Sequence, residues 1–189
     1  QKFQDLIPPY VDALIRAKME AHPRIRMALF DYGVKGEFRV RDLEIAAVRT
    51  NKIIQGTELS TLSSEYFNTK TTVKESGLTI HLDPSKVYYS AKLESERLET
   101  VDVLNRFKNE LNHPLSICDP YCGVGPALAH IIACEGLFSS ILANDLNPEC
   151  MPFLFKNLPP LNDHDPEKFL NKTHNLIAIN PSILIGNID

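Results

Sequence analysis

The sequence has 189 residues, of which 43% are hydrophobic and 23% charged, as expected for a globular chain that buries a core. Its net charge of -4 gives no overall basic field, so composition does not favour a nucleic-acid partner, although a local basic patch would be enough for RNA. No apolar run approaches the roughly 20 residues that cross a bilayer, so we expect no membrane partner.

The four cysteines contain no C-x-x-C pair, and no histidine lies at a zinc-ligand spacing from them. They are Cys118, Cys122, Cys134 and Cys150. We therefore predict no metal site and interpret them as small buried side chains in a reducing compartment. This favours an intracellular protein of the cytoplasm or the mitochondrial matrix. The chain begins with Gln1 rather than methionine, so we expect residues upstream.

A helix is predicted over residues 8–21, because Pro8 and Pro9 mark its start and Pro23 stops it. Two sets of alternating apolar residues then suggest strands with a slip of register between them. These residues are Phe38 and Val40, followed by Leu43, Ile45 and Ala47. Residues 49–70 are polar and weakly patterned, which predicts a long loop or insertion.

Leu78, Ile80 and Leu82 alternate with polar residues, which predicts a half-buried strand. A Glu-Ser-Gly turn at residues 75–77 precedes this strand and favours a hairpin. From residue 93 the apolar period becomes helical, up to the His-Pro pair at residues 113–114. The predicted apolar face of this helix is Leu98, Val101, Leu104, Phe107 and Leu111.

Strand and helix patterns alternate after residue 112. Strands are predicted at residues 115–118, 140–144 and 176–179, and helices at residues 127–134 and after Asn147-Pro148. Pro152 predicts a late start or a distorted first turn for the second of these helices. The alternation predicts an α/β fold in which residues 113–189 form a Rossmann-like parallel sheet. Residues 1–112 are predicted to form an N-terminal α+β domain with a helical lead-in and a linker helix.

The first strand of this sheet leads into Asp119, and a loop with Gly123 and Gly125 separates it from the next helix. Glycine lets the backbone turn sharply and approach a ligand closely. The second strand is followed by Asp145, and an acid at this point can accept hydrogen bonds from both ribose hydroxyls. NAD would require a third glycine where the chain has Leu128, so S-adenosylmethionine is the favoured cofactor.

Each of these features also has a plain structural alternative. The glycines would suit a tight turn that binds nothing, and Asp145 would suit a helix N-cap or an exposed loop. Asp163 or Asp165 would suit the adenine amino group near the end of a third strand, but both lie in a stretch rich in proline and acids that would equally form an exposed loop.

Five segments together resemble the archaeal and eukaryotic tRNA (guanine-N1) methyltransferases, which modify the guanine 3′ of the anticodon. They are Gly-Glu-Phe-Arg (36–39), Leu-Glu-Ile (43–45), Lys-Val-Tyr-Tyr-Ser-Ala-Lys-Leu-Glu-Ser-Glu-Arg (86–97), Asp-Pro-Tyr-Cys-Gly-Val-Gly-Pro (119–126) and Ala-Asn-Asp-Leu-Asn-Pro (143–148). The likeness runs from about residue 6 to residue 180. It implies a class I S-adenosylmethionine methyltransferase sheet behind a small α+β domain, with tRNA as the favoured partner and rRNA as an alternative.

The resemblance implies roles for four further residues. Glu96 matches the general base that removes the guanine N1 proton, and Arg39 matches the arginine that stabilises charge on O6. Tyr88 matches an active-site tyrosine, and Asn180 matches the asparagine that orients the base. The alternatives are a solvated glutamate at a helix start, an arginine on an exposed strand face, a strand tyrosine and a strand-ending turn.

Several departures from the family pattern support a second hypothesis. Lys92 stands in place of arginine, Ala127 in place of phenylalanine, and the Asn-x-Pro of the family is shortened to Asn180-Pro181. The second hypothesis is a catalytically silent assembly factor or scaffold in a ribonucleoprotein, for example a mitochondrial ribosome. A third is a relative that transfers the aminocarboxypropyl group to wybutosine precursors.

The sheet is expected to be incomplete at its C-terminal end, because family members continue with further strands. The strand at residues 176–179 would then present an unpaired apolar edge. Either the polypeptide continues beyond residue 189, or a protein or ribonucleoprotein partner covers this edge.

Overall fold

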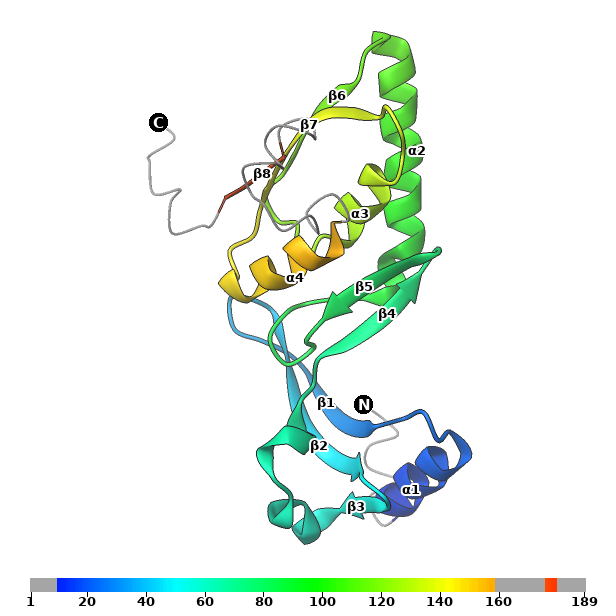
Figure 1. Cartoon of the computed structure of the whole chain (residues 1–189), viewed down its shortest axis with the longest axis vertical. Helices are drawn as coiled ribbons and strands as arrows, with labels where there is room; N and C mark the ends of the chain where they lie inside the picture. Colours follow the sequence, from blue (N-terminus) through cyan, green and yellow to red (C-terminus); the bar gives the residue numbers. More distant parts are fainter. Residues whose placement is uncertain (1–9, 159–175, 180–189) are drawn as a thin grey trace. The chain divides into compact units, whose positions relative to one another are not determined.

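The computed structural model describes residues 10–158 and the backbone of strand Leu176–Ile179 (Figure 1). The chain divides into two compact units. The first contains the residues up to Lys35 together with Arg41–Thr69, and the second contains Gly36–Val40 and all residues from Lys70 onward.

The first unit is a helix packed on a three-stranded sheet. Helix α1 (Val11–Ala21) is followed by strands β1 (Met27–Lys35), β2 (Val40–Arg49) and β3 (Ile53–Gln55), in the sheet order β1-β2-β3. Its small core consists of Met19, Ala47 and Ile53, with partly buried apolar residues around them. The helix predicted over residues 8–21 is therefore confirmed.

Two predictions for the first unit were wrong. The segment 49–70 is not a long loop, because β3 pairs antiparallel with β2 and is followed by the short helices η2 (Gly56–Thr61) and η3 (Ser64–Phe67). Ile53 and Ile54 are buried there, but three residues are too few to show an alternation. Phe38 lies in the turn between β1 and β2 rather than in a strand, and β1 was not predicted.

The second unit begins with the predicted hairpin. Strands β4 (Thr71–Glu75) and β5 (Leu78–Leu82) pair antiparallel, with Glu75 opposite Leu78. Ser76 and Gly77 form the two-residue turn, and both have positive φ angles, 45° and 85°. This backbone matches the twist of the strands in a tight hairpin. The inward side chains Ile80 and Leu82 are buried, as the alternation predicts.

Helix α2 (Glu94–Leu111) follows a short turn of helix, η4 (Ala91–Leu93), and ends at Asn112 in the left-handed conformation. Its predicted apolar face was wrong in part, because Leu98, Phe107 and Leu111 are all at least 40% exposed. The buried stripe instead runs through Arg97, Val101 and Leu104, at helical spacing. A charged residue thus occupies a core position, which an apolar count does not detect.

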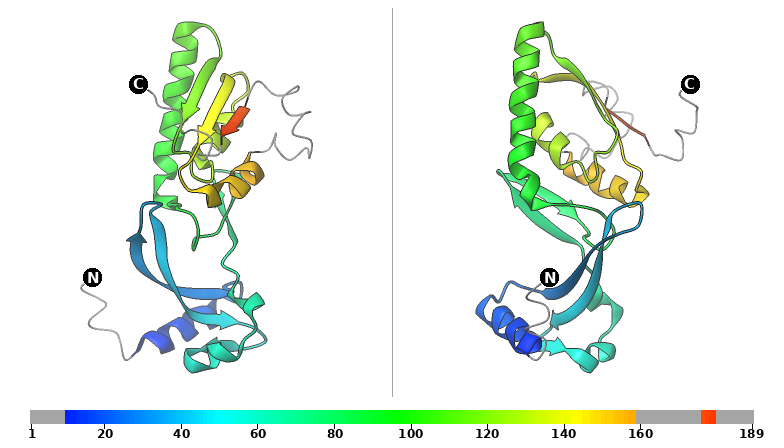
Figure 2. Two further views of the ribbon diagram at one scale, coloured as in Figure 1. Left: turned by 90° about the vertical axis from the view of Figure 1, so that its left-hand side faces the viewer. Right: turned by 180° about the vertical axis from the view of Figure 1, so that it is seen from behind.

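The parallel sheet has the order β6-β7-β8, formed by Leu115–Asp119, Phe138–Asn144 and Leu176–Ile179 (Figure 2, left). Helix α3 (Pro126–Ile132) connects β6 to β7 and packs against α2. The short helix η5 (Pro148–Cys150) and helix α4 (Met151–Asn157) follow β7. The predicted strands and helices are confirmed, including the distorted turn ahead of Pro152. Within the described residues β8 is the last strand on its side of the sheet.

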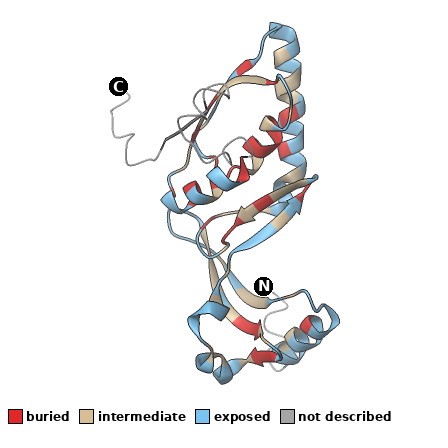
Figure 3. Ribbon diagram, in the orientation of Figure 1, coloured by how far each residue is buried: buried red, intermediate tan, exposed pale blue. Residues whose placement is uncertain are grey.

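The hairpin, α2 and the parallel sheet share one core. Ile80 of β5, Val101 of α2 and Leu115 of β6 belong to the same buried cluster as Leu128 and Leu154 (Figure 3). This shared core explains why the compact units separate between Thr69 and Lys70, whereas the predicted boundary lies near residue 112. Among the described helices, none combines the length and the apolar character that a bilayer crossing requires.

Candidate cofactor and catalytic site

The carboxyl ends of β6 and β7 place Asp119 and Asp145 at the same edge of the sheet. Between them, the Cys122 N–H donates to the Asn144 carbonyl oxygen at 2.9 Å. The Gly123 N–H donates to Asp145 Oδ2 at 2.7 Å. The structure therefore brings the glycine loop and the strand-end acid into direct contact, although 22 residues separate them in the sequence.

The Asp145 carboxylate is held from two sides. Its Oδ1 accepts the Asn147 N–H at 2.9 Å, and Asn147 Oδ1 in turn accepts the Glu149 N–H at 3.0 Å. Asn147, not Asp145, is the residue that caps η5. Because each carboxylate oxygen has two lone pairs, both oxygens of Asp145 keep capacity to accept a hydroxyl group from a ligand.

The two loop glycines serve different structural needs. Gly125 is the N-cap of α3 with a φ of 77°, and a Cβ there would lie 2.5 Å from Leu154 Cδ1 of α4. Gly123 has a φ of 57°, and a Cβ there would lie 4.0 Å from the Tyr88 carbonyl oxygen. Gly125 is thus required by the packing of two helices and by its backbone angle. Its expected role in letting a ligand approach the backbone stays a prediction.

The charge at this sheet edge is negative. Burial raises the pKa of the Asp119 carboxyl, the hydrogen bond from the Tyr121 N–H opposes this, and the charge on Asp145 raises it further. Burial, with Asp145 nearby, also raises the pKa of the Cys150 thiol to about 12. Two neighbouring carboxylates suit a ligand that carries hydroxyl groups and a positive charge.

The cysteines are all free thiols. Cys122 and Cys150 are buried as expected, but Cys118 is exposed and Cys134 only half-buried. Cys118 occupies an exposed position of β6, so the prediction of burial was wrong for it. The residues that the structure describes contain no cluster of histidine, cysteine and acidic side chains suited to a metal ion.

Two residues of the predicted catalytic set lie together. The Arg39 guanidinium carbon is 5.7 Å from the centroid of the Tyr88 ring, within range of a cation–π contact. Arg39 lies in the turn before β2 with a φ of 52°, not on a strand face, and Tyr88 lies in a segment without strand structure. Since the Tyr88 carbonyl faces Gly123, this pair borders the glycine loop.

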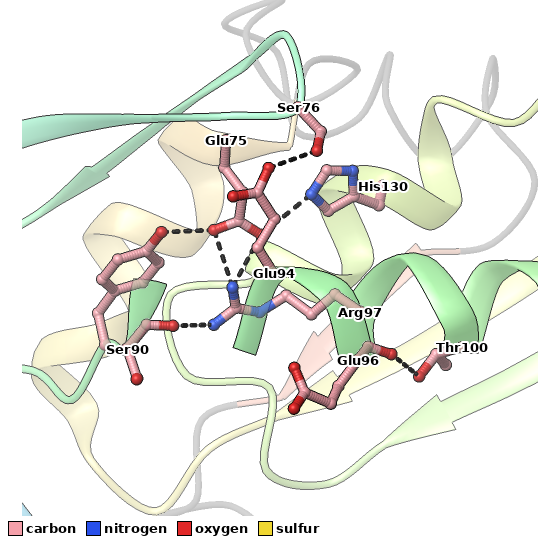
Figure 4. Close-up of polar contacts among 9 residues, drawn as sticks. Glu75, Ser76, Ser90, Glu94, Glu96, Arg97, Thr100 and His130 are labelled. Atoms are coloured by element: carbon pink, nitrogen blue, oxygen red, sulfur yellow. Dashed lines mark hydrogen bonds and ion pairs between the residues drawn. The ribbon is translucent and has the colours of Figure 1, made fainter. Parts of the chain in front are cut away.

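Glu96 lies in the first turn of α2, where its side chain is exposed. Figure 4 shows its carboxylate directed away from the cluster around Glu75. Its backbone carbonyl oxygen accepts a hydrogen bond from the Thr100 hydroxyl at 2.8 Å. The structure therefore does not join Glu96 to Arg39 or Tyr88. Asn180 and Asp163 lie outside the described residues.

Sequence reasoning missed a buried polar cluster around Glu75, whose side chain is only 1% exposed. Arg97 Nη1 donates to both carboxylate oxygens at 2.8 Å, and His130 Nε2 lies 3.1 Å from Oε1 (Figure 4). The Tyr89 hydroxyl also donates to Glu75, and Arg97 Nη2 donates to the Ser90 carbonyl at 2.8 Å. The signal in the sequence was Arg97, which stands at core spacing from Val101.

This cluster shifts the ionisation of its members. Burial by itself would raise the pKa of Glu75, but the hydrogen bonds from Tyr89, Arg97 and His130 outweigh it and hold that pKa below its ordinary value. Burial and the Glu75 carboxylate raise the pKa of Tyr89 to about 12. At neutral pH, Glu75 is therefore a buried carboxylate and Tyr89 a neutral donor.

A second missed residue, Asn157, joins the glycine loop to the hairpin. It is 5% exposed at the end of α4. Its Oδ1 accepts the His81 N–H at 2.7 Å, and its Nδ2 donates to the carbonyl oxygens of His81 at 2.9 Å and Val124 at 2.8 Å. An isolated asparagine near a helix end gives no sequence signal for such a bridge.

Proteins of known function resemble this chain. A relative from Trichomonas vaginalis, a tRNA (guanine(37)-N(1))-methyltransferase, is 34% identical over 154 residues, which is 81% of this chain and 34% of the relative. The tRNA (guanine(37)-N(1))-methyltransferase 1 of Phaeodactylum tricornutum is 32% identical over 139 residues, covering 72% of this chain and 28% of the relative. The chain thus spans about a third or less of the length of these relatives.

Solved structures share the fold. The complex of aTrm5 with tRNALeu matches 96% of this chain and 44% of that chain, with a TM-score of 0.62 and 24% identity. TYW2 of Pyrococcus horikoshii in complex with MeSAdo matches 92% and 48%, with a TM-score of 0.54 and 21% identity. At these identities the likeness shows the Rossmann-like methyltransferase fold. The profile of the TRM5/TYW2 methyltransferase domain matches residues 71–174, more than half of the sequence, and the chain therefore belongs to this family.

Proposed function

We propose that this chain is part of an S-adenosylmethionine-dependent methyltransferase that modifies N1 of a tRNA guanine beside the anticodon. The observation that carries the proposal is the 2.7 Å hydrogen bond between the Gly123 N–H and Asp145, which assembles a nucleoside-binding edge in a member of this family. The relatives named tRNA (guanine(37)-N(1))-methyltransferase support the choice of reaction.

The residues at the sheet edge fit the chemistry of the cofactor. Asp145 would accept the ribose hydroxyls, and Asp119 would lie near the positive charge of the sulfonium or the amino group. Gly123 supports this arrangement by fixing the Asp145 carboxylate. Asp163 is proposed for the adenine amino group. When bound, S-adenosylmethionine supplies an electrophilic methyl group.

The catalytic roles are proposed from the family pattern and elementary chemistry. The guanine N1 would form the bond to the methyl group as the sulfur–methyl bond breaks and leaves S-adenosylhomocysteine, and the N1 proton would pass to the Glu96 carboxylate. Negative charge that builds on O6 would be stabilised by the Arg39 guanidinium, which the Tyr88 ring holds at 5.7 Å. Asn180 would orient the base.

The test uses the full-length protein. Calorimetry measures S-adenosylmethionine binding, and mass spectrometry of digested tRNA transcripts measures the product, with an rRNA fragment as the comparison substrate. We expect 1-methylguanine in tRNA that carries guanine at the target position, and none when adenine replaces it. Glu96→Gln should slow the reaction at least about 100-fold, as loss of a general base does.

Three results would contradict this function in distinguishable ways. A product with the mass of an aminocarboxypropyl adduct would indicate the wybutosine-type reaction. Binding of S-adenosylmethionine without tRNA modification, and with Glu96→Gln identical to wild type, would remove the proposed catalytic roles. No binding, together with copurification in a large mitochondrial ribonucleoprotein, would favour the assembly factor.

A further inference from the structure

We propose that Glu75 is a positioning residue for methyl transfer, because its buried carboxylate binds Tyr89 and Arg97 and so fixes the segments that carry Tyr88 and Glu96. This inference rests on the proposed function. Glu75 itself lies at the end of β4 and is 1% exposed. It is therefore placed to act through other residues rather than on a substrate.

Each partner of Glu75 stands next to, or close behind, a residue of the proposed site. Tyr89 directly follows Tyr88, whose ring contacts Arg39. Arg97 directly follows Glu96 in the first turn of α2. His130 lies in α3, five residues after Gly125 of the glycine loop. The Glu75 carboxylate thus connects the segment of Glu96, the segment of Tyr88 and helix α3, which follows the glycine loop.

The geometry restricts these segments more than ordinary packing would. Arg97 Nη1 donates to both carboxylate oxygens of Glu75 at 2.8 Å, and Arg97 Nη2 donates to the Ser90 carbonyl oxygen at 2.8 Å. Its guanidinium carbon also lies 5.2 Å from the centroid of the Tyr89 ring. The planar guanidinium therefore sets both the start of α2 and the path of residues 89–90. With Arg97 directed inward, Glu96 is directed outward (Figure 4).

Stability alone is a weak reason for such a cluster. A buried ion pair often contributes little compared with well-packed apolar residues of the same volume, whereas removal of one partner leaves an uncompensated charge. A cluster with defined donors and acceptors instead admits one arrangement of its segments. A general base needs that kind of control, because a displacement of about 1 Å can slow a reaction roughly 100-fold.

The main test is Glu75→Gln in the full-length protein, measured by single-turnover methyl transfer to tRNA. We expect a rate at least about 10-fold below wild type and an affinity for S-adenosylmethionine within about 3-fold, since the change acts on the base and not on Asp145. Tyr89→Phe, which keeps the ring and the fold but removes one hydrogen bond to Glu75, should slow the rate about 3-fold.

The matched control is Glu94→Gln. Glu94 lies beside the cluster and accepts a hydrogen bond from the Ser76 hydroxyl, but it does not bind Arg97. This variant should stay within about 2-fold of the wild-type rate, because Glu94 is only partly buried and loses a charge that makes no contact with Arg97. Equal loss of rate in Glu94→Gln and Glu75→Gln would overturn the proposal.

A double variant separates positioning from general damage. If Glu75 acts through Glu96, then Glu75→Gln should have no further effect on the rate in a Glu96→Gln background. If instead the two losses multiply in full, Glu75 does not act through Glu96 and the proposal fails. A loss confined to KM for tRNA would overturn it as well.

Amide hydrogen exchange keeps the inference testable if the wild-type protein methylates nothing. Glu75→Gln, or Tyr89→Phe if the former does not fold, should accelerate exchange in residues 88–97 and in α3 while β7 stays protected. Faster exchange only within the β4–β5 hairpin, or uniformly through the second unit, would refute the connection. The exchange experiment does not test the proposed function, which is tested by the methylation assay of the wild-type protein.

Discussion

Gly125→Ala provides a stringent test of the cofactor loop, because it adds a single methyl group at the contact between α3 and α4. The added Cβ would lie 2.5 Å from Leu154 Cδ1, closer than carbon atoms pack, and 3.4 Å from Leu158 Cδ2, an ordinary contact. Overpacking of a core in this way costs about 1–3 kcal/mol. The φ of 77° adds about 1–2 kcal/mol for a residue with a side chain.

We therefore expect Gly125→Ala to destabilise the second unit by about 2–5 kcal/mol, the sum of these two effects. Urea unfolding followed by circular dichroism, with exchange of the β7 amides to report on this unit, measures the loss. Gly77→Ala is the control, since its φ is 85° but nothing lies within 4 Å of the added atom. Gly77→Ala should lower the free energy of unfolding only by the contribution that arises from the positive φ.

A second substitution tests the cause. Leu154→Val removes the atom that the new Cβ would contact. It should therefore lower the free energy of unfolding less in the Gly125→Ala background than in the wild type. The steric explanation is refuted if Gly125→Ala lowers the free energy of unfolding by no more than Gly77→Ala does. It is also refuted if the effects of Gly125→Ala and Leu154→Val on that free energy are simply additive.

Three further predictions concern the site and its supports. Asp145→Asn should weaken S-adenosylmethionine binding at least about 10-fold by calorimetry, because an amide offers one acceptor where the carboxylate offers two, while Glu149→Gln should leave binding unchanged. Asn157→Ala should lower the free energy of unfolding by about 2–4 kcal/mol, because it leaves the His81 N–H and two carbonyl groups without their partner, and unchanged stability would contradict this. Because the pKa of Glu75 is lowered on folding, its contribution is present above the unfolded value of about 4.3 and is lost as pH falls through the folded value. The melting temperature should therefore fall less steeply below this pH in Glu75→Gln than in wild type, and parallel curves would count against a lowered pKa.

Local patterns were enough to predict most elements of the second unit. The hairpin was predicted from the alternation at residues 78–82 and the Glu-Ser-Gly turn before it. The distorted helix start was predicted from Asn147-Pro148 and Pro152. The contact between the glycine loop and Asp145 follows from the strand order, because parallel strands bring their carboxyl ends to one edge. These features depend on residues close together in the sequence or on a regular topology.

The buried polar contacts could not be predicted in the same way. Glu75 stands in the predicted turn and Arg97 in the first turn of α2, and their burial depends on their pairing in space. Strand β3 is three residues long, too short for a period to be recognised. Leu98 and Phe107 followed a helical period but lie on the exposed side, because α2 packs along the stripe that contains Arg97.

The bridge made by Asn157 has a practical consequence for protein engineering. Its three hydrogen bonds join α4, the backbone at His81 and the loop at Val124. A chimaera that takes the parallel sheet from one homologue and the hairpin from another would have to reproduce this junction with mismatched backbones. Grafting experiments should therefore move everything from the hairpin to α4 as a single cassette, together with Gly36–Val40, which belongs to the same compact unit.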